Sequence, residues 1–282
     1  MIVVTGATGN IGRHLVGQLL AEGATVRAIS REPAAANLPD GVEVVKADLS
    51  DPTTIGSAFS GAEAVYLNLA ASGVQGGAAP VVKAVAEAGV KRIVLNSSSS
   101  VTYKGAEEGM IARAHAFAEK TVRDAGVEWT FVRGGMYAAN ALQWAASIKA
   151  DGVVRGPFPD AVAAPVHEAD LAAVTARALL DGAHAGTSPT VTGPAAVTLA
   201  EQVAAIGKAI GREITFETVS PEAAVEALAT DRFPKDAAQQ LVDFLGFTVG
   251  STPEITDEVE RITGKPARTF EQWAADHADD FR

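Results

Sequence analysis

Three glycines close to the N-terminus have the spacing of a phosphate-binding turn. Gly6, Gly9 and Gly12 stand between a short apolar run, residues 2–5, and a stretch with apolar residues at helical spacing. Gly6 permits a tight turn, Gly9 lets the backbone approach a pyrophosphate, and Gly12 lets the following helix pack on the strand. Glycines are common in turns of any kind, but their placement between a strand and a helix favours binding. We predict that a dinucleotide contacts the whole turn: Gly6, Ala7, Thr8, Gly9, Asn10, Ile11 and Gly12.

Arg31 indicates which dinucleotide binds. It follows a second predicted strand, residues 24–30, at the position where folds of this kind meet the adenosine ribose. A guanidinium pairs with a phosphate, whereas an acidic residue would accept hydrogen bonds from a ribose hydroxyl, so Arg31 favours NADP over NAD. Glu32 is next but precedes Pro33, and we expect it to face solvent. Arg13 either adds a second positive contact or is an exposed helix residue.

The ends of the next two predicted strands supply further candidate contacts. Asp48 and Leu49 follow the strand predicted for residues 42–46, and Asp48 can catch an adenine amine or instead cap the helix that begins near Pro52. The fourth predicted strand, residues 64–69, leads into residues expected to pass beneath the dinucleotide: Asn68, Leu69 and Ala70.

The elements that must position these residues alternate regularly. Predicted helices 52–59, 78–88 and 111–125 separate strands 64–69, 92–96 and 129–132. Regular alternation predicts an α/β fold with a Rossmann-type, doubly wound parallel sheet.

The regular alternation of strands and helices ends after Arg133. A helix at 170–180 and a strand at 190–192 are followed by one strand, 213–218, and by predicted helices 199–210, 221–229, 235–245, 253–262 and 270–278. We predict an NADP-binding core in residues 1–133, completed by about 165–195. Residues 134–164 and 196–282 are then a smaller, mainly helical substrate-binding cap.

Composition removes several classes of protein. The 282 residues include no cysteine, which excludes disulfides, thiolate catalysis and cysteine-ligated zinc. Five histidines without an HExxH pair make a catalytic metal improbable. His167, Glu168 and Asp170 invite a metal or triad interpretation, but Asp170 precedes an apolar run and is typical of a helix N-cap, and no GxSxG elbow occurs.

Charge and hydropathy bear on partners and location. The formal net charge of −11 argues against a nucleic-acid partner, because phosphate binding needs a cationic face. No apolar stretch reaches the roughly 18 residues that span a bilayer. Because the first predicted strand begins at Ile2, we expect no signal peptide. We expect a cytoplasmic monomer or homodimer that acts on a small molecule.

Several motifs together resemble one family. They are TGATGNIG at 5–12, Arg31-Glu32-Pro33, Ala47-Asp48, the serines at 97–100, His115-Ala-Phe-Ala-Glu119, Gly126-Val-Glu-Trp-Thr130, Arg133-Gly-Gly-Met-Tyr137-Ala-Ala-Asn140, Thr192-Gly193-Pro194 and Gly264-Lys-Pro-Ala-Arg-Thr-Phe270. Nearly the whole chain resembles the atypical short-chain dehydrogenase/reductases, in particular the NmrA-like group with its NAD(P)H:quinone oxidoreductases. The resemblance implies NADPH at the N-terminal turn and also in the loop after Arg133, at Gly135, Met136 and Asn140. Ser97 and Ser98 match the family's serine position, where Ser97 would contact the cofactor and Ser98 a substrate oxygen; a serine-rich turn without chemistry is the alternative.

The chain departs from the classical members of this superfamily at the catalytic pair. Those enzymes use a Tyr and a Lys four residues later, so that the ammonium lowers the pKa of the phenol. Four residues after the chain's three tyrosines, Tyr66, Tyr103 and Tyr137, stand Ala70, Glu107 and Ala141. Aligning Glu119 with the family's helix places Ile111 at the position of the Tyr and His115 at that of the Lys.

Three residues remain as candidates for catalysis: His115, Tyr137 and Ser98. His115 can hold the nicotinamide ribose or supply a proton, or it can be a structural histidine on an Ala-rich helix. Tyr137 and Asn140 face the cleft if the family geometry holds; otherwise Tyr137 packs and Asn140 caps a helix.

A quinone is a substrate that tolerates the missing pair, because hydride addition gives a stabilised phenolate that water can protonate. The sequence therefore predicts an NADPH-dependent reductase of a quinone or another conjugated, electrophilic small molecule. Two alternatives stay open, an NADP(H)-binding redox sensor without turnover and a non-redox enzyme, such as a cyclase or isomerase, on the same fold.

Overall fold

A computed structural model describes residues 1–69, 78–103, 109–230 and 234–282, and the chain forms two compact units. Unit 1 comprises Met1–Gly134, Glu168–Val191 and Glu258–Lys265. Unit 2 comprises Gly135–His167, Thr192–Asp257 and Pro266–Arg282. Residues 258–265, predicted as part of the cap, pack with unit 1 in the structure.

Unit 1 is built on a seven-stranded sheet in the order β3-β2-β1-β4-β5-β6-β9, and every neighbouring pair is parallel. The strands are β1 Ile2–Val4, β2 Val26–Ser30, β3 Glu43–Lys46, β4 Ala64–Leu67, β5 Arg92–Ser98, β6 Glu128–Gly134 and β9 Thr190–Val191. The strand order reverses between β1 and β4, which is where doubly wound sheets bind ligands at the carboxyl ends of their strands. The predicted Rossmann-type fold is confirmed.

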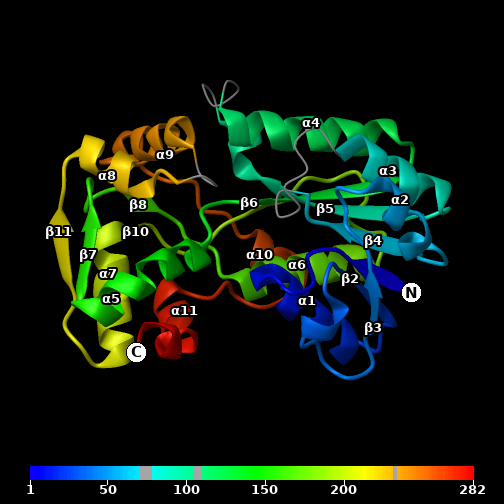
Figure 1. Cartoon of the computed structure of the whole chain (residues 1–282), viewed down its shortest axis with the longest axis horizontal. Coiled ribbons are helices and arrows are strands. Elements are labelled where there is room, and N and C mark those ends of the chain that lie inside the picture. The colour runs from blue at the N-terminus through cyan, green and yellow to red at the C-terminus, as the bar shows by residue number, and fades with distance from the viewer. Residues whose placement is uncertain (70–77, 104–108, 231–233) are drawn as a thin grey trace. The chain divides into compact units, whose positions relative to one another are not determined.

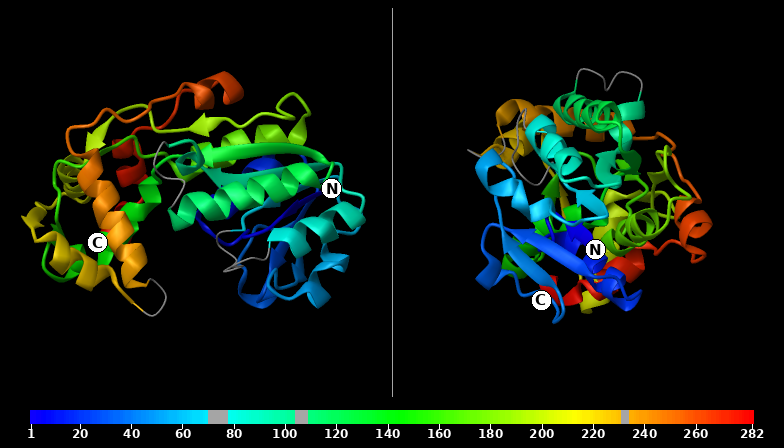
Figure 2. Two further views of the ribbon diagram at one scale, coloured as in Figure 1. Left: turned by 90° about the horizontal axis from the view of Figure 1, so that it is seen from above. Right: turned by 90° about the vertical axis from the view of Figure 1, so that its right-hand side faces the viewer.

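Helices cover both faces of this sheet (Figure 1, Figure 2). On one face α2 Pro52–Ile55, α3 Ala78–Glu87 and α4 Met110–Asp124 enclose an apolar core with strand residues such as Ile93 and Leu95. On the other, α1 Asn10–Ala21 packs against α6 Glu168–Leu180, with α10 Glu258–Thr263 beside α6. Near-continuous burial of β1 and β4 follows from this double coverage.

Unit 2 combines helices with two small sheets. Its strands are the parallel pair β7 Val153–Gly156 and β11 Thr215–Thr218, and the antiparallel pair β8 Val162–Ala163 and β10 Val197–Thr198. Helices α5 Ala145–Ala150, α7 Leu199–Ile210 and α11 Phe270–Asp276 share a core centred on Trp273, which is fully buried. A second apolar cluster joins α8 Pro221–Leu228 to α9 Lys235–Thr248.

Two predicted helices differ in the structure. The helix predicted for 253–262 is only α10, because the Thr256 N–H donates to the Thr192 hydroxyl at 2.9 Å and so lies outside any helical ladder. The helix predicted for 52–59 is α2 followed by a 3-10 turn, Ser57–Phe59, with Gly56, a poor helix former, between them.

No helix in the described part of the chain is long and apolar enough to cross a membrane.

Candidate functional site

The glycine turn closes tightly between β1 and α1. Gly6 has φ +62°, in the left-handed region that favours glycine. A Cβ on Gly12 would lie 2.1 Å from the Gly6 carbonyl oxygen and 2.7 Å from the Ala7 Cα, so no side chain fits there. A Cβ on Gly9 would lie 3.3 Å from the same oxygen. The helix therefore starts directly on the turn, as the spacing predicts.

The first turn of α1 suits an anion. Its N-cap residue is Gly9, which has no side chain with which to cap the first backbone N–H groups. Thr8, Gly9 and Asn10 are exposed, while Ala7, Ile11 and Gly12 are buried beneath them. An exposed helix N-terminus with free N–H groups and the positive end of the helix dipole fits the pyrophosphate of a dinucleotide.

Asn68 lies against this turn, at the end of β4. Its backbone N–H donates to the Thr5 hydroxyl at 2.8 Å, and that hydroxyl donates to the Tyr66 carbonyl oxygen at 3.0 Å. The Asn68 Cβ is 3.5 Å from the place where Gly6 would carry its own Cβ. Leu69 is buried, and the predicted contact Ala70 lies outside the described residues.

Arg31, directly after β2, and Arg13, in α1 just after the glycine turn, are both exposed. Arg13 donates from Nε to the Thr8 carbonyl oxygen at 2.9 Å and from Nη1 to the Asn37 carbonyl oxygen at 3.1 Å. It is thus an exposed residue of α1 that also ties the turn to the segment after β2. The Glu32 N–H donates to the Ser30 hydroxyl, and its side chain faces solvent, as expected.

Asp48 closes its own turn. Its carboxylate accepts from the Ser50 hydroxyl at 2.7 Å and from the Ser50 N–H at 2.9 Å. These hydrogen bonds lower the pKa of Asp48, with a smaller contribution from the positive charge of Arg31. The N-cap of α2 is Asp51, which accepts from the Thr53 N–H, so the alternative in which Asp48 caps this helix is wrong.

The two candidate serines point in different directions. Ser97 is fully buried and its hydroxyl donates to Glu119 Oε1 at 2.7 Å. Ser98 is half-buried and caps a 3-10 turn, Ser99–Thr102, by accepting from the Ser100 N–H at 3.2 Å. The Ser97 hydroxyl is therefore engaged by Glu119 in the interior of unit 1.

Glu119 joins α4 to the neighbouring strand β6 as well. Arg133 donates from Nε to Glu119 Oε1 at 2.8 Å and from Nη2 to Oε2 at 2.7 Å. The sequence pattern predicted no role for Glu119 or Arg133. The available signal was a carboxylate on the buried face of α4, beside Ala118 and Val122.

His115 precedes Glu119 by one turn of α4 and is half-buried, whereas Ile111 is 60% exposed. Burial lowers the pKa of His115, and the negative charge of Glu119 raises it in part. Because burial outweighs the charge, the imidazole is neutral near pH 7 and offers one donor and one acceptor. Tyr103, in the same unit, accepts a hydrogen bond at 2.9 Å from the Ser99 hydroxyl.

In unit 2, the residues after β6 form a short irregular segment. Tyr137 is half-buried and stands at the N-cap of a 3-10 helix, Ala138–Trp144. Asn140 lies inside this helix, not at its cap, and its Nδ2 donates to the Met136 Sδ at 3.1 Å. Gly135 is half-buried, and the Val166 N–H donates to the Met136 carbonyl oxygen at 2.8 Å.

The acidic residues around position 168 have a structural explanation. Helix α6 begins at Glu168, so Asp170 lies within its first turn and the predicted N-cap role of Asp170 is wrong. Carboxylates in a first helical turn are favoured by the helix dipole. His167 Nε2 is 3.3 Å from Asp276 Oδ2. Within the described ranges, no three His, Cys, Asp or Glu side chains gather as a metal site.

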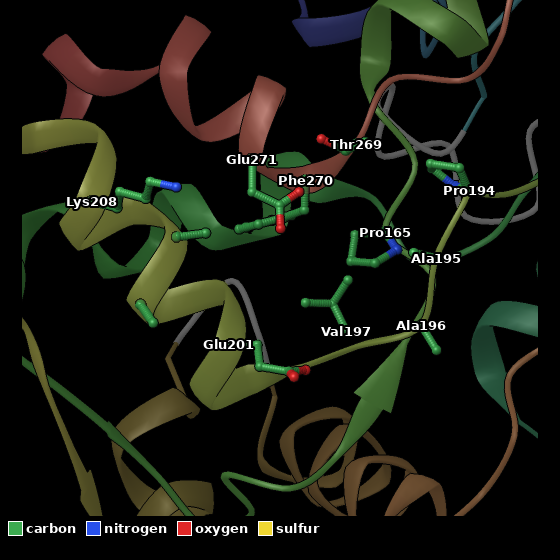
Figure 3. Close-up of a pocket in the computed structure, with 12 residues that line it drawn as sticks. Pro165, Pro194, Ala195, Ala196, Val197, Glu201, Lys208, Thr269, Phe270 and Glu271 are labelled. Atoms are coloured by element: carbon green, nitrogen blue, oxygen red, sulfur yellow. The ribbon is translucent and has the colours of Figure 1, made fainter.

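The surface of unit 2 has a groove of about 390 Å³, lined by Pro165, Pro194, Val197, Lys208, Phe270 and others (Figure 3). A second, of about 510 Å³, lies over α2 and α3 in unit 1. Neither groove contains a predicted site residue.

Comparison with known proteins finds one family along most of the chain. The model of the NmrA-like family matches residues 1–270. A Streptomyces griseus (4-alkanoyl-5-oxo-2,5-dihydrofuran-3-yl)methyl phosphate reductase is 37% identical, and the match covers 100% of this chain and 99% of that protein. An NAD(P)H azoreductase from Xenophilus azovorans is 30% identical, with 100% and 99% covered. The crystal structure of an NADPH-dependent quinone oxidoreductase from Escherichia coli, complexed with NADPH, superposes with a TM-score of 0.81 at 28% identity, covering 98% of this chain and 99% of that one.

Proposed function

The chain belongs to the NmrA-like family, and we propose that it is an NADPH-dependent reductase of a quinone or another conjugated, electrophilic small molecule. The relatives named above support the proposal, since their names describe reductases and two of the names include NAD(P)H or NADPH.

One observation of the structure carries the cofactor part of this proposal. The exposed N-terminus of α1, whose cap residue Gly9 has no side chain, lies beside the point where the strand order of the sheet reverses. This is the position at which doubly wound sheets hold a pyrophosphate. Arg31, exposed after β2, then supplies the charge that pairs with the 2′-phosphate of NADPH.

When bound, NADPH supplies a hydride to the electrophile. The residues of the chain bind and orient: the N–H groups of the glycine turn hold the pyrophosphate, and the neutral His115 donates one N–H to a ribose hydroxyl. Ser98 and Tyr137 are the proposed contacts to the substrate. Because the chain has no Tyr/Lys pair, water protonates the phenolate formed from a quinone.

The remaining parts of the proposal concern organisation and partners. We assign substrate binding to residues 134–164 and 196–282, and cofactor contacts to Gly135, Met136 and Asn140 in addition to unit 1. A net charge of −11 supports a small molecule rather than nucleic acid as the partner. A cytoplasmic monomer or homodimer is part of the same proposal.

Loss of NADPH absorbance on addition of quinones tests this function. The assay uses a panel of quinones, azo compounds and unsaturated carbonyl compounds. With a substrate from this panel, the initial rate should scale with protein concentration. Tyr103→Phe should leave the rate nearly intact, because no lysine stands four residues later to lower the pKa of the phenol. Tight NADPH binding with a rate at the buffer background across the panel would replace the reductase by a redox sensor.

A further inference from the structure

Ser97, Glu119 and Arg133 form a buried cluster at the carboxyl ends of β5 and β6. Ser97 and Arg133 are direct neighbours in the register of the two parallel strands, so both side chains reach the same face of the sheet. Glu119 comes down from α4 and accepts hydrogen bonds from both. One carboxylate therefore connects two strands and a helix.

The cluster is well matched in charge and geometry. The Glu119 side chain is 5% exposed and that of Arg133 18% exposed, so the ion pair is largely removed from water. A buried carboxylate needs both a counter-charge and hydrogen bonds to its oxygens. Arg133 supplies two parallel N–H donors at 2.8 and 2.7 Å, which is the bidentate arrangement that fixes geometry most strongly.

Two candidate site residues are close to this cluster along the chain. Ser98 is the residue directly after Ser97, and it caps the 3-10 turn by which the chain leaves β5. His115 lies four residues before Glu119, on the same side of α4, because residues four apart in a helix are neighbours. A change at Glu119 would move both at once without removing either.

We infer that Glu119 is a positioning residue: through Arg133 and Ser97 it locks the middle of α4 against the carboxyl ends of β5 and β6, and so sets where His115 and Ser98 stand. Ser97 belongs to this lock and not to the ligand-contacting side chains. The inference rests on the proposed function for its kinetic consequence, but the lock itself is a property of unit 1.

The same two strands provide a matched control. At their amino ends Arg92 and Glu128 are also register partners and also form an ion pair, with Arg92 Nη2 and Glu128 Oε2 3.0 Å apart. This pair joins β5 to β6 as well, but no candidate site residue is next to it. Glu128→Gln removes a strand-bridging carboxylate without touching the carboxyl ends.

Steady-state kinetics and NADPH binding compare Ser97→Ala, Glu119→Gln and Glu128→Gln. In Glu119→Gln we expect kcat to fall by about tenfold or more, because misplacement of a reacting group by a fraction of an ångström is costly. The dissociation constant of NADPH should rise by a smaller factor, since only the ribose contact of His115 is displaced and the glycine turn is untouched. Ser97→Ala, a small change in a packed site, should keep the fold and show the same split with a smaller loss, and Glu128→Gln should resemble the parent protein.

A spectroscopic measurement without NADPH separates the two proposals. The ring resonances of His115, assigned with a His115→Gln variant, should shift in Ser97→Ala, which keeps the charge of Glu119, as well as in Glu119→Gln, where loss of that charge adds to the shift, and should stay in place in Glu128→Gln. If the parent protein turns over no electrophile, the proposed function fails, and the His115 resonances still decide on the lock. Unchanged resonances together with unchanged kcat in folded Ser97→Ala and Glu119→Gln, or equal effects in Glu128→Gln, would overturn the inference.

Discussion

The two ends of strands β5 and β6 use the same kind of ion pair in different surroundings. At the amino ends, Arg92 pairs with Glu128, whose side chain is 52% exposed. At the carboxyl ends, Arg133 pairs with Glu119, whose side chain is 5% exposed and also holds Ser97. The two arginines are about equally buried, at 17% and 18% exposed, so the pairs differ in their carboxylates: water reaches Glu128, whereas Glu119 depends on its protein partners.

The contrast extends along the whole sheet. At the carboxyl ends lie the glycine turn, Arg31, Asp48 and Asn68. At the amino ends, Gly23 and Gly89 also have a positive φ that favours glycine, but a Cβ added to either would meet nothing within 4 Å. The turn at the carboxyl ends is therefore closely packed, and these two turns at the amino ends are open.

The largest expected effect is at Gly12. In Gly12→Ala the new Cβ would collide with backbone at 2.1 Å, so α1 must move away from the turn. We expect loss of measurable NADPH binding, by fluorescence titration, and a lower melting temperature. Gly17→Ala is the control in the same helix, since its Cβ meets nothing within 4 Å; it should bind normally and gain about 0.5–1 kcal/mol of stability. Normal NADPH binding by Gly12→Ala would contradict the assignment of the glycine turn to the cofactor site.

The two ion pairs should differ in stability by a measurable amount. Glu119→Gln leaves Arg133 largely buried without its counter-charge, which should lower the free energy of unfolding by about 3 kcal/mol. Glu128→Gln removes a carboxylate that is 52% exposed, and Arg92 keeps its hydrogen bond to the Leu179 carbonyl oxygen at 3.1 Å, so this variant should cost less than about 1 kcal/mol. Urea denaturation of both variants measures the difference, and equal losses would show that burial does not separate the two pairs.

The preference for NADPH over NADH gives a third contrast between the carboxyl and amino ends of the strands. The parent protein should bind NADPH more tightly than NADH, and Arg31→Glu should narrow or reverse the difference, at a cost of about 1.5–3 kcal/mol for one charge-assisted contact. Lys91→Glu makes the same charge change at the amino ends of the strands, where Lys91 is paired with Glu63. It should leave the preference intact. Equal affinities of the parent protein for the two cofactors would contradict a contact between Arg31 and the 2′-phosphate.

The smallest effect concerns His115 and pH. Burial lowers its pKa below the usual value of 6.5, so the unfolded chain takes up the proton first as pH falls. The contribution of neutral His115 to the free energy of unfolding is complete above about pH 6.5. It is lost as pH falls from there toward the lowered pKa, by at most about 1.4 kcal/mol per pH unit for one proton. His115→Gln should flatten the loss of stability between pH 7 and pH 5 and run parallel to the parent protein above pH 7. Identical slopes below pH 7 would contradict the burial of His115.

Much of the fold follows from local pattern. The glycine spacing between an apolar run and a helical run predicted β1, the turn and α1, because each depends on residues within a few positions. Alternation predicted the parallel sheet. The helix predicted for 253–262 was wrong because its outcome depends on Thr192, about sixty residues away, which accepts a hydrogen bond from Thr256. Propensity carries no information about such a partner.

The sequence by itself determined the type of site: a glycine turn for a pyrophosphate, an arginine after β2, and the absence of a Tyr/Lys pair, all of which are readable from residue type and spacing. Only the tertiary structure decided which serine faces inward and what Glu119 binds. Ser97 and Arg133 meet Glu119 from 22 and 14 residues away, through the register of β5 with β6 and the packing of α4 on both. Side-chain pairing over such distances depends on how elements pack, which no local pattern in the chain encodes.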